Sequence, residues 1–421
     1  MKIFKFGGAS VKDADGVRNL VKVLKHEGIS NTLVVISAMG KMTNAFEKVV
    51  QTYLFHKENL KASINFIDAF HSEIINQLFE KEHDIFKDVN RLIGHLHGFL
   101  IQNTSKDYNF IYDQVVCVGE LISTKIVSAF LEKELIHNEW LDVRTVIKTD
   151  DNYRNAAVNW EKTQQHCNKL LPHKLYITQG FIAKGSKNNT TTLGREGSDY
   201  SAGILAYCLD AESVTIWKDV EGVLNADPRV FDKTVLLENI SYQEAIEMAF
   251  YGASVIHPKT IKPLENKRIP LYVRSFDNIE NKGTKVSKGV DLHPKTSCYI
   301  VKKNQILVSI STNDFSFMVE ENLSKIFKQL HQDKLKVNLI QNSAISFSVC
   351  LEDNYSNFNQ FYDELHTNFK VKYNTNVTLY TVRHFDEETV KEIETKGDIL
   401  LKQSSRETLQ LVIDEKNNYD N

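Results

Sequence analysis

Cysteine is scarce in this sequence, and the few cysteines present are far apart. Only five occur among 421 residues, at positions 117, 167, 208, 298 and 350, and no two form a Cys-x-x-Cys pair. A disulfide framework or a zinc site is therefore not expected. The fourteen histidines contain no His-Glu-x-x-His arrangement, and the close pair His95 and His97 has no acidic or cysteine partner at ligand spacing. We expect no metal site built from histidine or cysteine.

A surplus of charge and a long apolar run are also missing. The chain carries 51 Lys+Arg and 54 Asp+Glu, a formal net charge of −3, whereas a nucleic-acid binder normally shows a basic surplus. No uninterrupted apolar run reaches the roughly 18 residues of a membrane helix. The strand-like start Met1–Phe6 is unlike a signal peptide. We therefore expect a cytoplasmic protein with neither nucleic acid nor membrane as a partner.

The first 290 residues alternate short apolar runs with segments of helical period. Strands are predicted at Ile3–Phe6, Thr32–Ser37, Lys174–Thr178, Ser213–Trp217 and Leu271–Ser275. Helices are predicted at Asp13–His26, Asn44–Tyr53, Gly119–Glu134, Ser198–Cys208 and Ser241–Tyr251, with two or three more within Phe55–Gln102. Strands that alternate with helices favour parallel pairing, so we predict a three-layer α/β fold with a mainly parallel sheet.

The remaining third of the chain has a different rhythm. Strand and helix patterns follow one another as β-α-β-β-α-β over about 70 residues, which is typical of a small open sheet with two helices on one face. A shorter β-α-β-β run follows. We predict an α/β domain at 1–285, a linker at 286–303, the βαββαβ domain at 304–376, an abbreviated unit at 377–414 and a disordered tail at 415–421.

Two polar loops near the N-terminus follow predicted strands, and ligands of open α/β sheets bind beyond the carboxyl ends of strands. In the first loop, Gly7 and Gly8 let backbone N–H groups approach a phosphate, and Lys5 adds a cation. The alternative is a tight turn with a surface lysine. The second loop, Ser37–Asn44, offers the Thr43 hydroxyl, which is equally explained by helix capping.

Two further loops mix charges with turn residues. Thr190–Asp199 brings Arg195 to a helix start, and a planar guanidinium suits a carboxylate ligand, although a solvated arginine before a capped helix explains the same pattern. Trp217–Arg229 can equally be an ordinary charged hairpin. The sequence has no Walker motif, no Rossmann Gly-x-Gly-x-x-Gly and no convincing Ser/His/Asp set. Phosphoryl transfer to a carboxylate needs no general base, because that nucleophile is already ionised.

Eight motifs occur in the order found in aspartate kinases, and the chain resembles that family. They are Lys5–Val11, Val118–Glu120, Trp140–Arg144 (a strand in the family), Gln179–Ile182, Thr190–Asp199, Lys218–Gly222, Asp227–Arg229 and Tyr251–Pro258. The C-terminal βαββαβ pattern resembles the ACT regulatory domains of the same family. Eight ordered motifs over about 260 residues are far more specific than any one of them.

The resemblance implies an amino-acid-kinase fold and transfer of the ATP γ-phosphoryl group to the side-chain carboxylate of L-aspartate. The product, 4-phospho-L-aspartate, begins the synthesis of lysine, threonine and methionine. By resemblance, Lys5 and Asp199 are catalytic, and ATP is held by Lys5, Gly7, Gly8, Lys218, Asp219, Leu224 and Arg229. The implied aspartate site is Thr43, Glu120, Arg195, Ser198 and Asp199. Mg²⁺ is expected to bridge ATP phosphates mostly through water, without a protein metal cluster. A homodimer through the ACT-like domains is also implied.

Several positions depart from the family pattern. Ala9 stands where threonine is usual, Glu196 replaces a glycine, and Ser254 replaces a nucleotide-contacting lysine. Lys218, which stands where threonine is usual, is our hypothetical substitute for that missing cation. Two alternatives to an active aspartate kinase stay open: a sister enzyme such as N-acetylglutamate or glutamate 5-kinase, and a sensing module that has lost activity.

The regulatory part also departs from lysine-sensing members of the family. Asn338 and Ala344 stand at positions expected to be acidic, so a lysine ammonium would lack its carboxylate partner. We therefore predict weak or absent inhibition by lysine.

Overall fold

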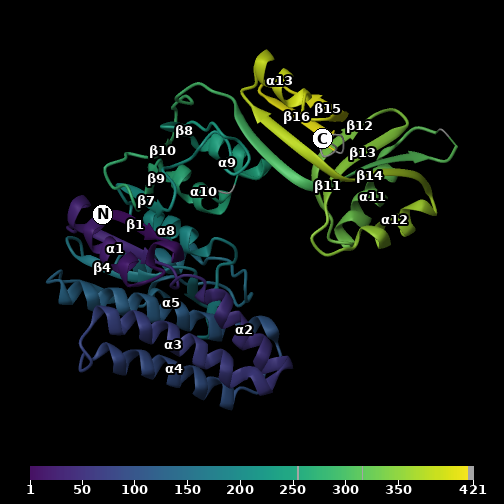
Figure 1. Ribbon diagram of the computed structural model, residues 1–421. Coiled ribbons are helices and arrows are strands. Elements are labelled where there is room, and N and C mark those ends of the chain that lie inside the picture. Colours follow the sequence, from purple (N-terminus) through teal and green to yellow (C-terminus); the bar gives the residue numbers. More distant parts are fainter. Residues whose placement is uncertain (254–255, 315, 416–421) are drawn as a thin grey trace. The chain divides into compact units, whose positions relative to one another are not determined.

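The computed structural model describes residues 1–253, 256–314 and 316–415 (Figure 1). Two compact units make up the chain. The N-terminal unit comprises Met1–Leu224, Leu236–Ile246 and Val255–Pro294, and the C-terminal unit comprises Asn225–Val235, Glu247–Ser254 and Lys295–Asn421. Two segments that the sequence assigns to the first domain, 225–235 and 247–254, therefore lie in the C-terminal unit. Of the tail predicted at 415–421, residues 416–421 lie outside the described residues.

An eight-stranded sheet forms the centre of the N-terminal unit, with the order β3-β4-β2-β1-β7-β9-β10-β8. Its strands are β1 (Lys2–Phe6), β2 (Thr32–Ile36), β3 (Glu139–Leu141), β4 (Leu175–Gln179), β7 (Ser213–Lys218), β8 (Asn239–Ser241), β9 (Leu271–Ser275) and β10 (Thr284–Ser287). All neighbours pair in parallel except β9 and β10. Every residue of β2 and β4 is buried, as expected where helices cover both faces of a parallel sheet.

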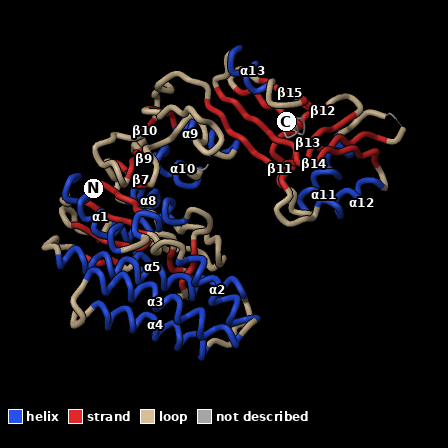
Figure 2. Tube along the Cα trace, viewed as in Figure 1, coloured by secondary structure: helices blue, strands red, loops and turns tan. Residues whose placement is uncertain are grey.

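Helices cover this sheet in two sets (Figure 2). They are α1 (Ala14–Glu27), α2 (Met42–Phe55), α3 (Leu60–Leu78), α4 (Ile85–Gln102), α5 (Tyr108–Lys133), α6 (Val143–Val146), α7 (Trp160–Cys167), α8 (Gly197–Cys208), α9 (Tyr242–Tyr251) and α10 (Pro258–Lys267). Helix α8, backed by α10, packs on β1, β2 and β7, whereas α5, backed by α2 and α4, packs on β2, β3 and β4. The predicted three-layer α/β fold is confirmed.

The long helix α5 differs from the prediction in where it begins. It begins at Tyr108 rather than at Gly119. Gly119 lies in the middle of the helix, where a Cβ would come 2.8 Å from the Phe46 ring of α2, so a glycine allows the two helices to approach. By length and composition α5 is also apolar enough to cross a membrane, although Glu120 and Lys125 interrupt its apolar stretch, as expected. The helix is 78% buried within the fold over that stretch, because it packs between the sheet and two other helices, as core helices of soluble proteins do.

Trp140–Arg144 is only partly the strand that the family resemblance implied. Strand β3 ends at Leu141, and the Asp142 side chain accepts a hydrogen bond from the Arg144 N–H at 3.0 Å, which caps the start of α6. A short hairpin, β5 (Ile182–Lys184) and β6 (Thr190–Thr192), follows β4 and was not predicted.

The C-terminal unit contains an antiparallel sheet of six strands, with the order β12-β13-β11-β14-β16-β15. Its elements are β11 (Cys298–Thr312), α11 (Glu320–Gln332), β12 (Lys336–Asn342), β13 (Ser346–Glu352), α12 (Phe358–His366), β14 (Phe369–Arg383), α13 (Glu387–Glu394), β15 (Asp398–Ser404) and β16 (Thr408–Asp414). The predicted order of strands and helices is confirmed for this region. One core cluster, which includes Val308, Phe347 and Phe361, packs α11 and α12 against the sheet.

Two expectations about the borders of this region are wrong. The linker at 286–303 overlaps β10 at its start and β11 at its end, and the two strands predicted on either side of residue 376 are the single strand β14. The polar run near Lys302 belongs to a strand because β11 and β14 pair along their length, with irregular register between Lys302 and Leu307. The first part of β11, Cys298–Lys302, thereby lies beside the abbreviated unit as an additional strand segment. Sequence periodicity did not reveal this segment.

Candidate active site

A cavity of about 540 Å³ lies in the N-terminal unit, beyond the carboxyl ends of the central strands. It receives residues from β1, α2, α5, the segment before α7, the segments after β4 and β6, the start of α8, and the end of β7. Four cationic side chains and three carboxyl groups line it, namely Lys5, Arg154, Arg195, Lys218, Glu120, Glu196 and Asp199. Parallel strands that end at one edge of the sheet bring together residues that are far apart in the sequence.

Lys5 and Asp199 form the tightest charged contact in this cavity. The Lys5 Nζ lies 2.5 Å from Asp199 Oδ1, and Lys218 Nζ lies 3.9 Å from Asp199 Oδ2. The side chains of Lys5 and Asp199 are less than one-tenth exposed. Two cations therefore share one carboxylate, and the excess positive charge at the ends of β1 and β7 favours an anionic ligand.

The glycine loop after β1 approaches the loop after β2. A Cβ on Gly8 would come 2.6 Å from the Gly40 carbonyl oxygen and 2.8 Å from that of Ala38, so only glycine fits. The Gly40 N–H donates to the Gly8 carbonyl oxygen at 2.9 Å, which joins the two loops. Gly7 and Gly8 themselves do not line the cavity. Their contact with phosphate stays a prediction.

Glu120 reaches the cavity from the middle of α5 and is 2% exposed. Burial raises the pKa of its carboxyl group to about 8, although the Ala38 N–H and the Lys5 charge partly oppose that shift. Its Oε2 atom has no hydrogen-bond partner among the described residues. A buried acceptor of this kind suits a cationic group supplied by a ligand.

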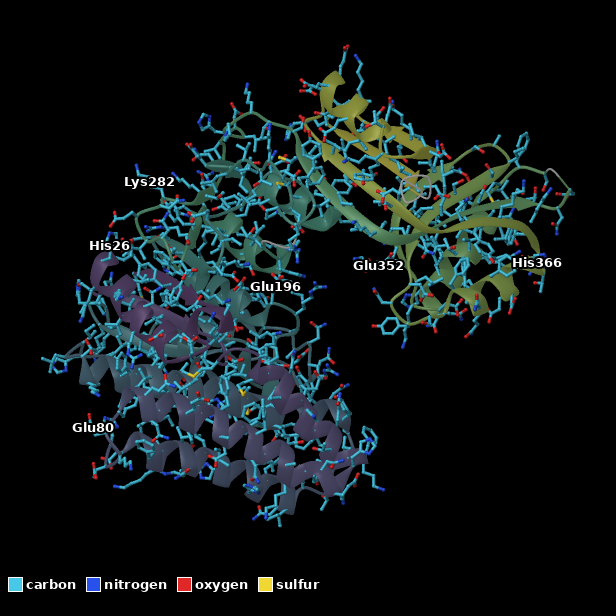
Figure 3. The ribbon with its side chains drawn as sticks, in the orientation of Figure 1. His26, Glu80, Glu196, Lys282, Glu352 and His366 are labelled. Atoms are coloured by element: carbon cyan, nitrogen blue, oxygen red, sulfur yellow. The ribbon has the colours of Figure 1, made fainter. Side chains whose placement is uncertain are left out.

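Arg195 and Ser198 lie at the start of α8. Arg195 is exposed and forms no ion pair within the described part of the chain. The neighbouring Glu196, which is labelled in Figure 3, has a left-handed backbone with φ 52°. A Cβ on Gly180 would come 2.5 Å from the Ser198 Cβ, so this glycine lets the start of α8 approach the end of β4. Thr43 lines the same cavity from the first turn of α2. The guanidinium is thus presented to ligands without an internal carboxylate.

Besides Gly7 and Gly8, three further residues of the expected nucleotide site do not line this cavity. Asp219 is exposed just after β7, and Leu224 forms an isolated bridge with Leu236. Arg229 belongs to a segment of the C-terminal unit, where its side chain is 84% exposed and pairs with Asp227 at 2.7 Å. Their roles with ATP stay predictions. Ser254, which departs from the family pattern, lies outside the described residues.

Several cavity residues were missed from the sequence, chiefly Tyr112, Arg154, Phe181 and Thr192. Phe181 and Thr192 lie within the motifs Gln179–Ile182 and Thr190–Asp199 but were not assigned to the site. Tyr112 and Arg154, in contrast, lie outside every recognised motif. Tyr112 lies eight residues before Glu120, on the part of α5 that the prediction left out, so a correct start for that helix would have been the signal for it.

The sequence matches the model of the amino acid kinase family over residues 1–275. A parallel α/β sheet with a cationic cavity at its strand ends agrees with this match, and the chain belongs to the amino acid kinase family. Within that family it belongs with the aspartokinases. It is 30% identical over 360 residues to the lysine-sensitive aspartokinase 3 of Escherichia coli, covering 83% of this chain and 78% of that relative.

Other relatives are longer than this chain. It is 32% identical over 296 residues to the chloroplastic bifunctional aspartokinase/homoserine dehydrogenase 2 of Arabidopsis thaliana, covering 67% of this chain and 32% of that protein. The chain thus spans about a third to a half of the length of the first bifunctional relatives it matches.

Two solved structures of Escherichia coli aspartokinase III resemble the whole chain. The complex with lysine and aspartate, described as the T-state, has a TM-score of 0.83, and the complex with aspartate and ADP, described as the R-state, has a TM-score of 0.80. Each is 26% identical and covers 99% of this chain and 96% of the solved chain.

Proposed function

We propose that this protein transfers the γ-phosphoryl group of ATP to the side-chain carboxylate of L-aspartate and forms 4-phospho-L-aspartate. The observation that carries the proposal is the charge arrangement of one cavity, in which Lys5 and Lys218 share Asp199 while Oε2 of the buried Glu120 carboxyl has no hydrogen-bond partner among the residues that the structure describes. Aspartate and ADP are the ligands of a solved relative.

The lysine pair suits the transfer step. A phosphoryl group in transfer carries negative charge on its outer oxygens, and fixed cations in a site with little water stabilise that charge. Lys5 is buried and held by Asp199, so its ammonium group is oriented before the substrate arrives. Lys5 and Asp199 are the residues we propose as catalytic, with Lys5 neutralising charge and Asp199 orienting it. The acceptor carboxylate is ionised at neutral pH, since its ordinary pKa is about 3.9.

The other cavity residues suit the two remaining charged groups of aspartate. Arg195 is proposed to bind the α-carboxylate, because its guanidinium is exposed and has no internal ion pair among the described residues. Glu120 is proposed to accept the α-ammonium group. The hydroxyl groups of Thr43 and Ser198 complete the polar lining.

ATP is proposed to enter as its magnesium complex and to contact Lys5, Gly7, Gly8, Lys218, Asp219, Leu224 and Arg229. Magnesium keeps several water ligands and is bound largely by substrate phosphates, so it needs few ligands from the protein. The described residues contain no group of three or more His, Cys, Asp or Glu side chains that would hold a metal by themselves. The residues present therefore fit a metal that is bound chiefly by the nucleotide.

The biological setting is part of the same proposal. The product would begin lysine, threonine and methionine synthesis in the cytoplasm, and the C-terminal unit would pair with a second copy through its ACT-like sheet. Weak or absent lysine inhibition is supported by the state of Asn338. Its Oδ1 accepts a hydrogen bond from Lys302 Nζ at 2.8 Å and its Nδ2 donates to Gln305 Oε1 at 2.7 Å, so a lysine of the chain itself already engages this amide.

The experiment that tests the proposed reaction is an assay with ATP, Mg²⁺, aspartate and hydroxylamine, which converts an acyl phosphate to a stable hydroxamate. We expect aspartyl hydroxamate to form in proportion to ADP. Glutamate and N-acetylglutamate, tested in parallel, would give the product instead if the chain were a sister kinase. Binding of aspartate and ATP without any hydroxamate would contradict catalysis and support a sensing module.

A further inference from the structure

Arg154 is a cavity residue for which the proposed reaction has no role. It lies between α6 and α7, in a stretch without a recognisable motif, and its side chain lines the same cavity as Arg195 and Lys5. The charge of Arg154 is not buried, since its side chain is 41% exposed, so the contacts that orient the guanidinium indicate what it does.

The guanidinium of Arg154 is oriented by three contacts, of which the longest is to the Tyr108 ring, whose centre lies 5.5 Å from the arginine Cζ. The same Cζ lies 4.2 Å from the centre of the Tyr112 ring, and Nη2 lies 3.3 Å from Glu47 Oε1. The same Glu47 oxygen accepts the Tyr108 hydroxyl at 3.1 Å. Among the described residues the guanidinium makes no other side-chain hydrogen bond. Stacking on an aromatic face leaves the edge of a guanidinium, with its N–H donors, available for a planar acceptor.

The ion pair with Glu47 is open to exchange. The side chains of Arg154 and Glu47 are 41% and 30% exposed, so neither charge is trapped and both can be solvated when the pair separates. A carboxylate that arrives in the cavity can therefore bind Arg154 without leaving Glu47 buried and unpaired.

The backbone of Arg154 is held more firmly than its side chain is. This residue has a left-handed conformation with φ 67°, which a non-glycine residue adopts only where its surroundings hold it. Its N–H donates to both carboxylate oxygens of Asp113, at 3.2 and 3.1 Å. Asp113 is fully buried and also accepts the Thr192 N–H at 2.9 Å and the Thr192 hydroxyl at 2.8 Å.

These contacts place Arg154 beside the segment that carries Arg195. A Cβ on Gly194 would come 3.3 Å from the Arg154 carbonyl oxygen and 2.9 Å from Asn155 Oδ1, so the two segments touch. Lys218 lies on the other side, at the end of β7, which neighbours β1 opposite β2 and β4. The two arginines thus come from touching segments, whereas the two lysines proposed for phosphoryl transfer come from the ends of β1 and β7.

We propose that Arg154 is a specificity-determining residue that, together with Arg195, binds the carboxylate of the amino-acid substrate that does not react. This inference rests on the proposed function and deepens it, because it names a dicarboxylic amino acid with a free α-carboxylate as the substrate class. Glu47 keeps the guanidinium in place while the cavity lacks substrate, and the α-carboxylate replaces it on binding. Asp113 acts through Arg154 and Thr192 as a positioning residue.

The test compares aspartate with its α-amide, which keeps the reacting side-chain carboxylate but lacks the α-carboxylate. ADP release is measured for the full chain and for Arg154→Gln. We expect kcat/KM for aspartate to fall about tenfold or more through KM, as loss of charged hydrogen bonds predicts. The kcat/KM for the α-amide should change less than about threefold. The preference for aspartate, which is the ratio of kcat/KM for aspartate to that for the α-amide, should therefore fall by nearly as much as kcat/KM for aspartate does. An unchanged preference overturns the proposal.

Two matched variants separate recognition from a structural role. Glu47→Gln removes the ion pair but keeps the guanidinium, so the preference for aspartate should be retained. A loss of preference in Glu47→Gln equal to that in Arg154→Gln would overturn the proposal, because the ion pair would then be the important feature. Should Arg154→Gln fail to fold, Arg154→Lys keeps the charge without the planar fork and should narrow the preference about threefold or more, and an unchanged preference overturns the proposal.

Failure of the proposed function gives a different result. If the unmodified chain releases no ADP with aspartate, the kinase proposal falls, and calorimetric titration then tests Arg154 by binding alone. Tighter binding of aspartate than of its α-amide, with the difference lost in Arg154→Gln, supports the recognition role. Equal loss of affinity for both compounds contradicts it.

Discussion

In the N-terminal unit, Glu120 is buried with a carboxyl oxygen that has no described hydrogen-bond partner, whereas in the C-terminal unit the partly buried Lys302 ammonium is satisfied by Asn338. Both groups have shifted pKa values for the same reason. Burial raises the pKa of Glu120 to about 8 and lowers the pKa of Lys302 to about 8. The two sites differ in their hydrogen bonds. Glu120 keeps an acceptor oxygen for a ligand, whereas Lys302 already has a partner on a side chain of its own sheet.

The comparison teaches where a ligand is needed to complete the structure. An unpartnered buried polar group lowers stability until something binds to it, and a satisfied group gains little from a further partner. The activity and stability of the protein are therefore expected to depend on ligands mainly through the cavity of the N-terminal unit.

Removal of the Lys5 charge should have the largest effect. Lys5→Met takes away the buried ammonium that we propose neutralises the transferring phosphoryl group, so kcat should fall by about a thousandfold or more. Lys25→Met is a matched control, because Lys25 is half exposed and pairs with Glu134 outside the cavity. Steady-state ADP release measures both variants, and thermal unfolding checks that Lys5→Met is folded. A fall of less than tenfold would remove Lys5 from catalysis.

Loss of Arg195 should have the next largest effect. Arg195→Ala removes the proposed partner of the α-carboxylate and should lower kcat/KM for aspartate by about a hundredfold or more through lost orientation. The KM for ATP should stay within about twofold, because the nucleotide is proposed to contact Lys5 and Lys218 and not Arg195. A change below threefold in kcat/KM for aspartate would exclude Arg195 from the site.

Aspartate binding should depend on pH through Glu120. Its pKa of about 8 in the unliganded fold means that the carboxyl is mostly protonated at pH 7, whereas the aspartate ammonium requires the ionised form. KM for aspartate should therefore fall as the pH rises towards 8, by up to about tenfold per unit, and level off above it. Calorimetry in two buffers should show proton release on binding at pH 7. A pH-independent KM that matches that of Glu120→Gln would contradict this role.

A rise in pH, which should favour aspartate binding through Glu120, should lower the stability of the substrate-free fold through the same carboxyl group. Its pKa is raised from 4.5 to about 8 on folding, so the folded chain holds the proton more tightly than the unfolded chain does. The stabilisation that it contributes is complete below pH 4.5 and is lost as the pH rises through about 8. Thermal unfolding from pH 6 to 9 should show a smaller loss of stability in Glu120→Gln than in the parent chain.

Lysine should have the smallest effect. Because Lys302 already engages Asn338, added lysine at about 1 mM should change the rate less than twofold, since its ammonium would need a carboxylate partner. The lysine-sensitive aspartokinase 3 of Escherichia coli is the positive control in the same assay. Strong inhibition of this chain would show that its regulatory sheet keeps an effector site despite the internal contact.

Local pattern predicted most elements of both units. The expected strand Leu271–Ser275 matches β9, and the expected helix Ser198–Cys208 begins one residue after the start of α8. At the start of the helix expected at Ser241–Tyr251, the Ser241 hydroxyl oxygen accepts a hydrogen bond from the Glu244 N–H at 3.0 Å, as in a capping box. These elements were predictable because their signals lie within a few neighbouring residues.

Elements that depend on distant partners were not predictable in the same way. Strands β3, β5, β6 and β8 have three residues each and take their conformation from pairing with other segments. Strand β11 begins within an expected linker because β14, about 80 residues later, pairs with it. Pairing over such separations leaves little trace in local periodicity.

The sequence by itself determined the alternation of strands and helices and the motifs of the strand-end loops, including Lys5, Arg195 and Asp199. Glu120 was expected in the site from the family resemblance, whereas only the tertiary structure decided that Arg154 reaches the same cavity as Lys5. It also set the state of Glu120, because a carboxyl group acquires a raised pKa from the low-polarity surroundings that packing creates. Motifs are local in the chain, whereas burial and the meeting of strand ends arise only when the sheet assembles.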